Sequence, residues 1–384
     1  FLPNDCQMTV GASGTAGSLV TIRGDASSYD ASYPDALWAG AANAGYYEDG
    51  WTLEDAEHNI WRIWNTNGSA PHTCVEDGVR RLTRRYDTDF ATWAPGSFHK
   101  AAGGGGWLYY KPSDDQSAND HTFSNASGTL IDLNGEDYLH LLNLEVRNSI
   151  TSNGMVRLVD SDYVTIEGCT FEAAEICVHI REDSDHGQVL DSHIGDTGGP
   201  IYLIGAGNDD WTIRGNEIYD VNQDGHFYSY DSHGIGLQTT KGTLIEYNHV
   251  HHCGGSGITF YQGTSLTEME DNVVRYNFVH DVADLGGEGR NQRGIEYGNT
   301  NSPHPADYNT GNRVYGNIVA HIVNEGLRNK SQASDLGDTW VWFNNTVYAT
   351  GDGYEFHDRP TGNSGFRVKN TIFAETAYPH MNHA

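Results

Sequence analysis

The sequence predicts an all-β fold, a single-stranded right-handed parallel β-helix of about nine or more coils. The main observation is a slot that recurs along the chain and usually reads Asn-x-(Val/Ile/Phe), with a Gly-containing turn after it. A second strand, often beginning Gly-Ile, precedes each slot. Successive slots lie 23 to 40 residues apart, which suits three-strand coils, some with inserted loops. The slot residues are Asn143, Cys169, Ser192, Asn216, Asn248, Asn277, Asn317, Asn345 and Asn370.

Asparagine has a physical reason to occupy this slot. When Asn residues stack at one corner of a solenoid, their side-chain amides can hydrogen-bond up and down the stack. Asn also tolerates the left-handed backbone conformation that tight corners need. We therefore interpret the slot residues as structural and expect no catalytic role for them.

The repeat also divides the chain. Residues 1–127 are expected to form an N-terminal cap and elaborated first coils, with insertions that flank a groove, because an open solenoid end must be covered. Residues 128–376 are expected to be the regular coils that carry the catalytic face. Residues 377–384 are expected to be a C-terminal tail.

Charge and composition exclude several partners. The 384 residues include 52 acidic and 22 basic side chains, a formal net charge of -30. Such a field repels nucleic acid and anionic lipid, so we expect neither partner. No apolar run reaches the roughly 18 residues of a transmembrane helix. The chain opens at Phe1 without a signal peptide, which indicates a processed or trimmed start; we expect a secreted, extracellular monomer.

The cysteines give little information on the compartment. There are five, without the CxxC spacing of a metal site, so at least one of them is a free thiol or pairs outside the chain.

The strand before each slot predicts an outward face with unusual side chains. Alternation along a strand sends its apolar members inward and the residues between them outward. In this acidic chain an ordinary solvated face would carry short polar residues, whereas this one carries Arg, His and aromatic residues. The outward set is Arg157, His179, Arg181, Tyr202, Gly236, Gln238, Thr259, Tyr261, Glu296, Arg328, Lys330, Glu355 and His357.

The sharpest motif lies in the loop that enters this face. Tyr228, Asp231 and His233 are spaced Tyr-x-x-Asp-x-His, just before the strand that begins at Gly234. The ordinary pKa of Tyr is high and that of His is near neutrality, so one can act as an acid while the other acts as a base. Asp231 can orient His233. The motif predicts proton transfer at a sugar carbon and a sugar oxygen.

The coil pattern and this motif resemble those of secreted β-helix carbohydrate-active proteins. Residues 128–376 carry the Gly-Ile and Asn-x-(Ile/Val)-x-(His/Asp) pattern. Tyr228-Ser-Tyr-Asp231-Ser-His233 is similar to the Tyr-x-x-Asp-Pro-His motif of alginate C5-epimerases, although Ser232 replaces the proline. Tyr261 stands where that family has an acidic residue, and its lysine is missing. The resemblance implies uronate chemistry that epimerases share with alginate lyases.

A lyase also needs a group that neutralises the uronate carboxylate. Arg and Lys can do so by charge-assisted hydrogen bonds. Ca²⁺ is the usual substitute, but no loop shows a calcium signature, and no other cofactor is expected. Tyr202 and Tyr261 can stack on sugar rings. The substrate-binding candidates are Arg157, His179, Arg181, Tyr202, Gln238, Tyr261, Arg293, Arg328, Lys330 and His357.

Other activities remain open at this point. A glycoside hydrolase needs two carboxyl groups on one face, and Asp231 and Glu296 are candidates, with Glu355 further along. A C5-epimerase and a non-catalytic glycan-binding or tailspike-like adhesin are further alternatives. The leading hypothesis is a polysaccharide lyase that cleaves an acidic, alginate-like glycan, with Tyr228 and His233 transferring protons.

A run of histidines has the residue types of a zinc site. His249, His251 and His252 precede Cys253. Because alternation sends neighbouring residues to opposite faces, we interpret them as structural or surface residues.

Overall fold

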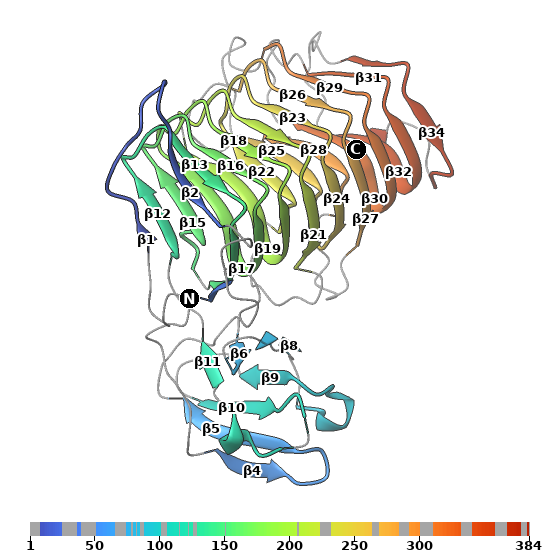
Figure 1. Ribbon diagram of the computed structural model, residues 1–384. Coiled ribbons are helices and arrows are strands. Elements are labelled where there is room, and N and C mark those ends of the chain that lie inside the picture. Colours follow the sequence, from blue (N-terminus) through green and yellow to red (C-terminus); the bar gives the residue numbers. More distant parts are fainter. Residues whose placement is uncertain are drawn as a thin grey trace.

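The computed structural model shows a long parallel β-solenoid with two small sheets beside its N-terminal coils (Figure 1). The structure describes residues 8–24, 37–39, 51–65, 74–77, 80–81, 83–84, 88–100, 106–114, 116–121, 123–125, 129–149, 151–205, 207–222, 232–262, 269–283, 292–299, 310–331, 340–357, 367–377 and 382–383.

Each coil contributes one strand to each of three faces. The first face is a ten-stranded parallel sheet. Its strands are β2 (Val20–Arg23), β13 (Leu139–Leu142), β16 (Thr165–Glu167), β18 (Gln188–Leu190), β20 (Thr212–Arg214), β23 (Leu244–Glu246), β26 (Val273–Arg275), β29 (Arg313–Tyr315), β31 (Val341–Phe343) and β33 (Arg367–Lys369).

The second and third faces form one 17-stranded sheet, because four long strands continue around the corner between them. These strands are β17 (Thr170–Arg181), β19 (His193–Ile204), β30 (Ile318–Ser331) and β32 (Thr346–His357). Their first halves lie on the second face with β3 (Leu37–Ala39), β14 (Glu145–Ser149), β21 (Glu217–Val221), β24 (His249–Cys253), β27 (Phe278–Val282) and β34 (Ile372–Ala374). Their second halves lie on the third face with β1 (Met8–Thr9), β12 (Ile131–Asn134), β15 (Val156–Val159), β22 (Ile235–Gln238), β25 (Ile258–Gln262), β28 (Ile295–Asn299) and β35 (Asn382–His383).

An amide ladder follows the corner between the first and second faces. The Oδ1 of Asn277 accepts the backbone N–H of Asn248 at 3.0 Å, and the Oδ1 of Asn317 accepts the backbone N–H of Asn277 at 3.0 Å. A bond from a backbone N–H to a side-chain oxygen links each successive pair among Cys169, Ser192, Asn216, Asn248, Asn277, Asn317 and Asn345, with the Ser192 hydroxyl as the acceptor for Cys169 and an Asn Oδ1 in the other pairs. The predicted stacking of the slot residues is therefore confirmed for these seven.

The prediction is wrong for Asn143 and Asn370, because both lie one position before the ladder. Each has a positive φ, 53° and 49°, as do Tyr247 and Tyr276, which precede ladder residues. Asn is favoured in the ladder and also in the left-handed residue before it, so the sequence pattern could not separate the two positions.

The interior of the solenoid is a continuous apolar column. Val, Ile and Leu dominate it, and its largest fully buried side chains along the coils are Trp211, Tyr297, Trp340, Trp342 and Tyr354. This column holds the outward residues of all three faces at fixed positions relative to one another.

Two small sheets come from the N-terminal region and have their own core. One contains β4 (Thr52–Asp55), β5 (Ile60–Asn65), β8 (Thr83–Arg84), β9 (Ser97–Lys100) and β10 (Gly106–Lys111). The other contains β6 (Cys74–Glu76), β7 (Arg80–Arg81) and β11 (Phe123–Asn125). Two 3₁₀ turns, Phe90–Thr92 and Ala118–Asp120, accompany them.

The division of the chain at residues 127 and 376 stays a prediction.

Among the described residues there is no helix with the length and apolarity to cross a membrane.

The ladder predicts a large cost for a single truncation. Asn277 is 1% exposed, donates to the carbonyl of Ile245 and to Asn317, and accepts twice from Asn248. We expect Asn277→Ala to lower the free energy of unfolding by about 2 to 4 kcal/mol, because it leaves buried polar groups unpaired. Urea unfolding measures this. Gln188→Ala, which truncates an exposed amide on β18, should change stability by less than about 0.5 kcal/mol; equal losses would contradict the role of the ladder.

Candidate active site

The third face carries the predicted outward residues in two parallel rows. Cα pairing joins Arg157, His179, Tyr202, Gly236, Thr259, Glu296, Arg328 and Glu355 in the first row. The second row lies two residues further along each strand and includes Arg181, Ile204, Gln238, Tyr261, Gly298, Lys330 and His357. The alternation in the sequence therefore placed these residues on one face, while their roles stay predictions.

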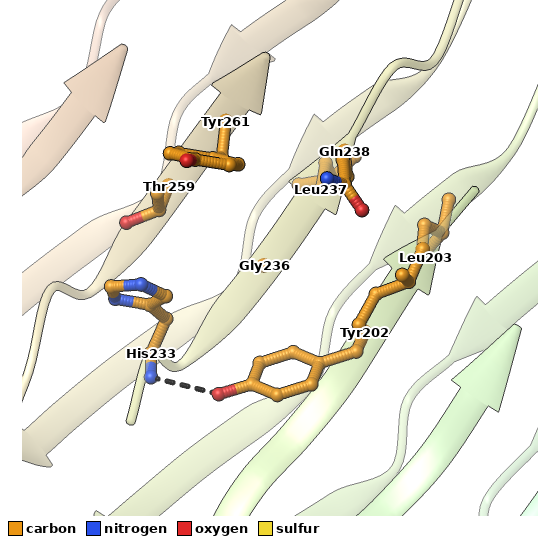
Figure 2. A pocket seen from close by; sticks show the side chains of 9 residues that line it. Tyr202, Leu203, His233, Gly236, Leu237, Gln238, Thr259 and Tyr261 are labelled. Atoms are coloured by element: carbon orange, nitrogen blue, oxygen red, sulfur yellow. Dashed lines mark hydrogen bonds between the residues drawn. The ribbon is translucent and has the colours of Figure 1, made fainter. Parts of the chain in front are cut away.

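A pocket of about 120 Å³ opens between three coils of this face. Figure 2 shows Tyr202 from β19, Gln238 from β22, and Thr259 and Tyr261 from β25 around it, with His233 at one side. Glycine at position 236 is needed here, since a Cβ would lie 2.8 Å from the ring of Tyr202. The ring of Tyr202 therefore occupies the space over Gly236 that a side chain would fill, and it forms part of the pocket wall.

Two hydrogen bonds hold His233 at the pocket. Its backbone N–H donates to the hydroxyl of Tyr202 at 3.2 Å (Figure 2), and its Nδ1 accepts the backbone N–H of Ser256 at 3.2 Å. A backbone N–H can only donate, so Nδ1 carries no proton in this arrangement. Neutral His233 then carries its proton on Nε2, the nitrogen suited to donate.

Two members of the predicted catalytic motif, Tyr228 and Asp231, lie outside the described residues. Of that motif, the structure places only His233, which is half-buried beside the pocket.

A buried cluster of charges adjoins the pocket along the first row. Both carboxylate oxygens of Glu296 lie 3.1 Å from Nη1 of Arg293, and Oε1 lies 3.1 Å from Nη1 of Arg328. Arg293 also contacts Glu325 at 2.8 Å, and Arg328 contacts Glu355 at 2.6 Å. We call these five residues the charge cluster. Three carboxylates face two guanidinium groups, so the cluster favours a proton on one of its carboxyls.

The cluster joins the pocket through Ser256 and Gly298. The hydroxyl of Ser256 donates to Oε2 of Glu296 at 3.0 Å, while its backbone N–H holds His233. A Cβ on Gly298 would lie 3.6 Å from Oε1 of Glu296 and 3.8 Å from the ring of Tyr261. Gly298 therefore lies between the carboxylate and that ring.

The charge cluster drives two glutamate pKa values in opposite directions. Burial disfavours the charge of Glu296, but Arg293 and Arg328 outweigh it, and the pKa of Glu296 falls below its ordinary value. Burial raises the pKa of Glu325, Arg293 opposes that rise, and the neighbouring carboxylate of Glu355 adds to it. One carboxyl is thus held ionised while the other retains its proton to higher pH.

The arginines proposed to bind substrate carboxylates are already paired within the protein. Arg157 forms a two-pronged bond with Asp132, at 2.9 and 2.7 Å, and Arg181 lies 3.4 Å from Glu182. Arg293 and Arg328 belong to the charge cluster. Each described arginine of the predicted set therefore faces a carboxylate of the chain. The cluster carboxylates face guanidinium groups in turn, which makes them poor ligands for Ca²⁺.

Other predicted contacts differ in exposure. Tyr261 is 38% exposed, as a stacking residue should be, whereas Tyr202 is 5% and His179 is 4% exposed. Lys330 and His357 follow the register of the second row, but their side chains are outside the description. Direct substrate contact by all of these residues stays a prediction.

Sequence reasoning missed Glu325 and Ser256. Glu325 lies at an odd spacing from Arg328, so strict alternation does not group the two, and the pairing of β30 with β32 shifts register between Ile322 and Glu325. Ser256 precedes the strand and belongs to a corner. An acidic residue directly before a Gly-initiated strand was the signal available for Glu325.

The fold agrees with comparisons to known proteins. Residues 107–235 match the family model described as "Right handed beta helix region", which confirms the predicted handedness. None of the curated proteins matches the chain by sequence.

Solved structures extend the likeness. The XylC structure with xylose superposes with a TM-score of 0.55 at 12% identity, over 82% of this chain and 58% of that one. A glycoside hydrolase gives 0.48 at 12%, over 77% and 58%, and the Erwinia carotovora polygalacturonase gives 0.44 at 10%, over 68% and 74%. The chain thus spans a little over half of XylC and of that hydrolase. At these identities the likeness shows the fold.

His179 gives a prediction for the dependence of stability on pH. Burial, followed by the charge of Arg181, lowers the pKa of His179 to about 4 from its ordinary 6.5. Unfolded chains therefore bind this proton at a higher pH than the folded protein. The stabilisation is complete above pH 6.5 and is lost as the pH falls toward 4.

Between pH 7.5 and pH 5, His179→Gln should remove about 2 kcal/mol of pH-dependent unfolding free energy. Urea unfolding at the two pH values measures it, with His186→Gln, an exposed histidine, as the matched control. If the wild type and His179→Gln lose the same stability on acidification, His179 is not held neutral.

Proposed function

We propose that this chain is an extracellular polysaccharide-degrading enzyme that binds its glycan along the third face and hydrolyses it. The observation that carries the proposal is the pair Glu296 and Glu325, whose pKa values are driven apart beside a pocket. Divergent pKa values are the usual mark of an acid and an ionised partner in one active site. This favours the hydrolase alternative, with Glu325 as a residue that the sequence did not indicate.

The two carboxyl groups have distinct roles in this proposal. Glu325 donates its proton to the leaving glycosidic oxygen as the bond from that oxygen to the anomeric carbon breaks. A water molecule then adds to the anomeric carbon and gives a proton back to the Glu325 carboxylate. Glu296 stays ionised and supplies negative charge to the oxocarbenium-like transition state. Glycosidases place their carboxyl groups about 5 to 9.5 Å apart, and a single guanidinium, that of Arg293, bridges both groups here.

The surroundings favour a glycan of low charge. The described arginines of the face are paired with carboxylates of the chain, so these arginines offer little charge to neutralise a polyuronate. Tyr261 offers an exposed ring on which a sugar can stack, and Gly298 lies between this ring and Glu296. The xylose bound by XylC, a structure with the same fold, makes xylan a sensible first substrate to test.

A lyase is the second candidate, and His233 is the observation that favours it. Its neutral form directs the Nε2 proton away from the Ser256 bond, which suits an acid that protonates a sugar oxygen. Tyr228 would then be the base. This reaction needs a neutralising cation that the described arginines do not readily supply.

The products separate the two reactions. On xylan, alginate, pectate and glucuronan, a hydrolase releases reducing ends without new absorbance near 235 nm, whereas a lyase produces that absorbance. We expect reducing ends alone. A rise near 235 nm that disappears in Tyr228→Phe and His233→Ala would overturn the hydrolase proposal in favour of elimination.

Substitutions of Glu325 and Glu296 test the separate roles of the two carboxyl groups. We expect Glu325→Gln to lower kcat on the polysaccharide by about 100-fold or more, since general acids contribute on that order. An aryl glycoside has a leaving group that needs no acid, so Glu325→Gln should keep most activity on it, while Glu296→Gln should lose both. Glu167→Gln, on the first face beside His140, is the matched control. Equal loss on both substrates would remove Glu325 from the acid role.

The pH profile follows from the same shifts. Activity should fall on the acid side as Glu296 becomes protonated, below its ordinary 4.5, and on the alkaline side as Glu325 loses its proton, above 4.5. With the aryl glycoside, Glu325→Gln should lose the alkaline limb of kcat/KM and keep the acid limb. An unchanged alkaline limb would assign it to another group.

A further inference from the structure

A second cluster of titratable groups lies on the second face, apart from the pocket. Glu217 on β21 pairs in register with His249 on β24, and His251 on β24 pairs in register with His280 on β27. Because His249 and His251 are two residues apart, they project from the same side of the sheet. The alternation argument against a metal site separates His251 from His252, but it leaves His249, His251 and Glu217 together.

Three side-chain atoms converge in this cluster. Oε1 of Glu217 lies 4.0 Å from Nδ1 of His249 and 3.5 Å from Nε2 of His251, and one ligand atom from each of the three residues lies within 4.8 Å of the other two. The Nε2 atom of His251 is buried and makes no hydrogen bond to any described residue. A buried imidazole nitrogen that faces a carboxylate oxygen at 3.5 Å without a hydrogen bond between them is arranged as two ligands of one cation are.

Glu217 and His251 are each oriented by a second contact, made by the polar atom that does not face the cluster centre. Oε2 of Glu217 lies 2.8 Å from Nδ1 of His193, and Nδ1 of His251 lies 2.6 Å from Nδ1 of His252. The positive φ of His252, 51°, turns its ring back toward His251 at the end of the strand. These contacts leave Oε1 and Nε2 as the atoms that face the centre of the cluster.

The orientation of His249 follows from a relay. Oδ2 of Asp281 lies 2.7 Å from Nδ1 of His280 and can only accept, so the proton of His280 sits on Nδ1. The Nε2 lone pair of His280 then accepts from Nε2 of His249, 2.7 Å away. Neutral His249 is left with a lone pair on Nδ1, the nitrogen that faces Glu217. A carboxylate–His–His relay of this kind fixes the tautomer of a metal-binding histidine.

We propose that Glu217, His249 and His251 bind one divalent transition-metal ion of the zinc class. Two imidazole nitrogens and one carboxylate oxygen are the ligand types that Zn²⁺, Co²⁺ and Ni²⁺ prefer, whereas Ca²⁺ and Mg²⁺ take oxygen ligands. Zinc–ligand bonds of about 2.0 to 2.2 Å require the three atoms, which lie within 4.8 Å of one another, to draw closer. Side-chain exposures of 40% for Glu217 and 44% for His249 leave the fourth position open to solvent. The site is independent of the proposed hydrolase.

Isothermal titration of the chelator-treated full chain with ZnCl₂ tests the proposal, and Co²⁺ provides a visible spectrum that reports tetrahedral nitrogen and oxygen ligands. We expect one ion per chain. His251→Ala and His249→Ala should each weaken binding by about 100-fold or more. His280→Gln, which removes the relay and the stacking of His280 on His251 but none of the three ligands, should weaken it by about 10 to 100-fold. His186→Ala, beside Asp210 in the turn before β18, should bind as the wild type does.

Thermal unfolding of the metal-free proteins identifies any variant that fails to fold, and His249 is exposed enough to be replaced without disturbing the core. No stoichiometric ion, or equal affinity in His251→Ala, His249→Ala and His186→Ala, would overturn the proposal. Loss of hydrolysis in the Glu325 tests leaves this result unaffected, because zinc binding is measured without substrate.

Discussion

The fixed register between successive coils is the constraint on which the rest of the structure depends. Each coil hydrogen-bonds to the next along all three faces, and the amide ladder from Cys169 to Asn345 fixes one corner. Because the apolar column prevents sliding, residues that are 20 to 40 positions apart in sequence become neighbours about 4.8 Å apart. Glu296 and Arg328 meet in this way, as do Glu217 and His249. Both proposed sites are therefore products of coil stacking.

The fold and the membership of the outward face could be predicted because both depend on local periodicity. The slot residues recur with each coil, and alternation assigns sides along a strand. Asn143 and Asn370 were misplaced by one residue because a left-handed corner and a ladder position both favour Asn. These errors are confined to corners, where the backbone leaves the strand geometry that alternation assumes.

The chemistry of the face was harder to predict, because it depends on which charges meet across coils. Arg293 and Arg328 have the residue type for binding a uronate, but each contacts a carboxylate of the chain. Glu325 escaped notice since β30 shifts register beside it. In a chain with 52 acidic and 22 basic side chains, arginines will usually find internal partners. That imbalance shifts the proposed function from elimination toward acid-assisted hydrolysis.

The charge cluster holds the pKa values of two glutamates on opposite sides of the ordinary carboxyl value. Carbon-13 NMR of protein labelled at the glutamate carboxyl carbon measures both titrations, with Glu325→Gln and Glu296→Gln assigning the signals. We expect Glu325 to titrate above 4.5 and Glu296 below it. Two ordinary titrations near 4.5, or the reverse order, would contradict it and leave the cluster as a purely structural ion pair network.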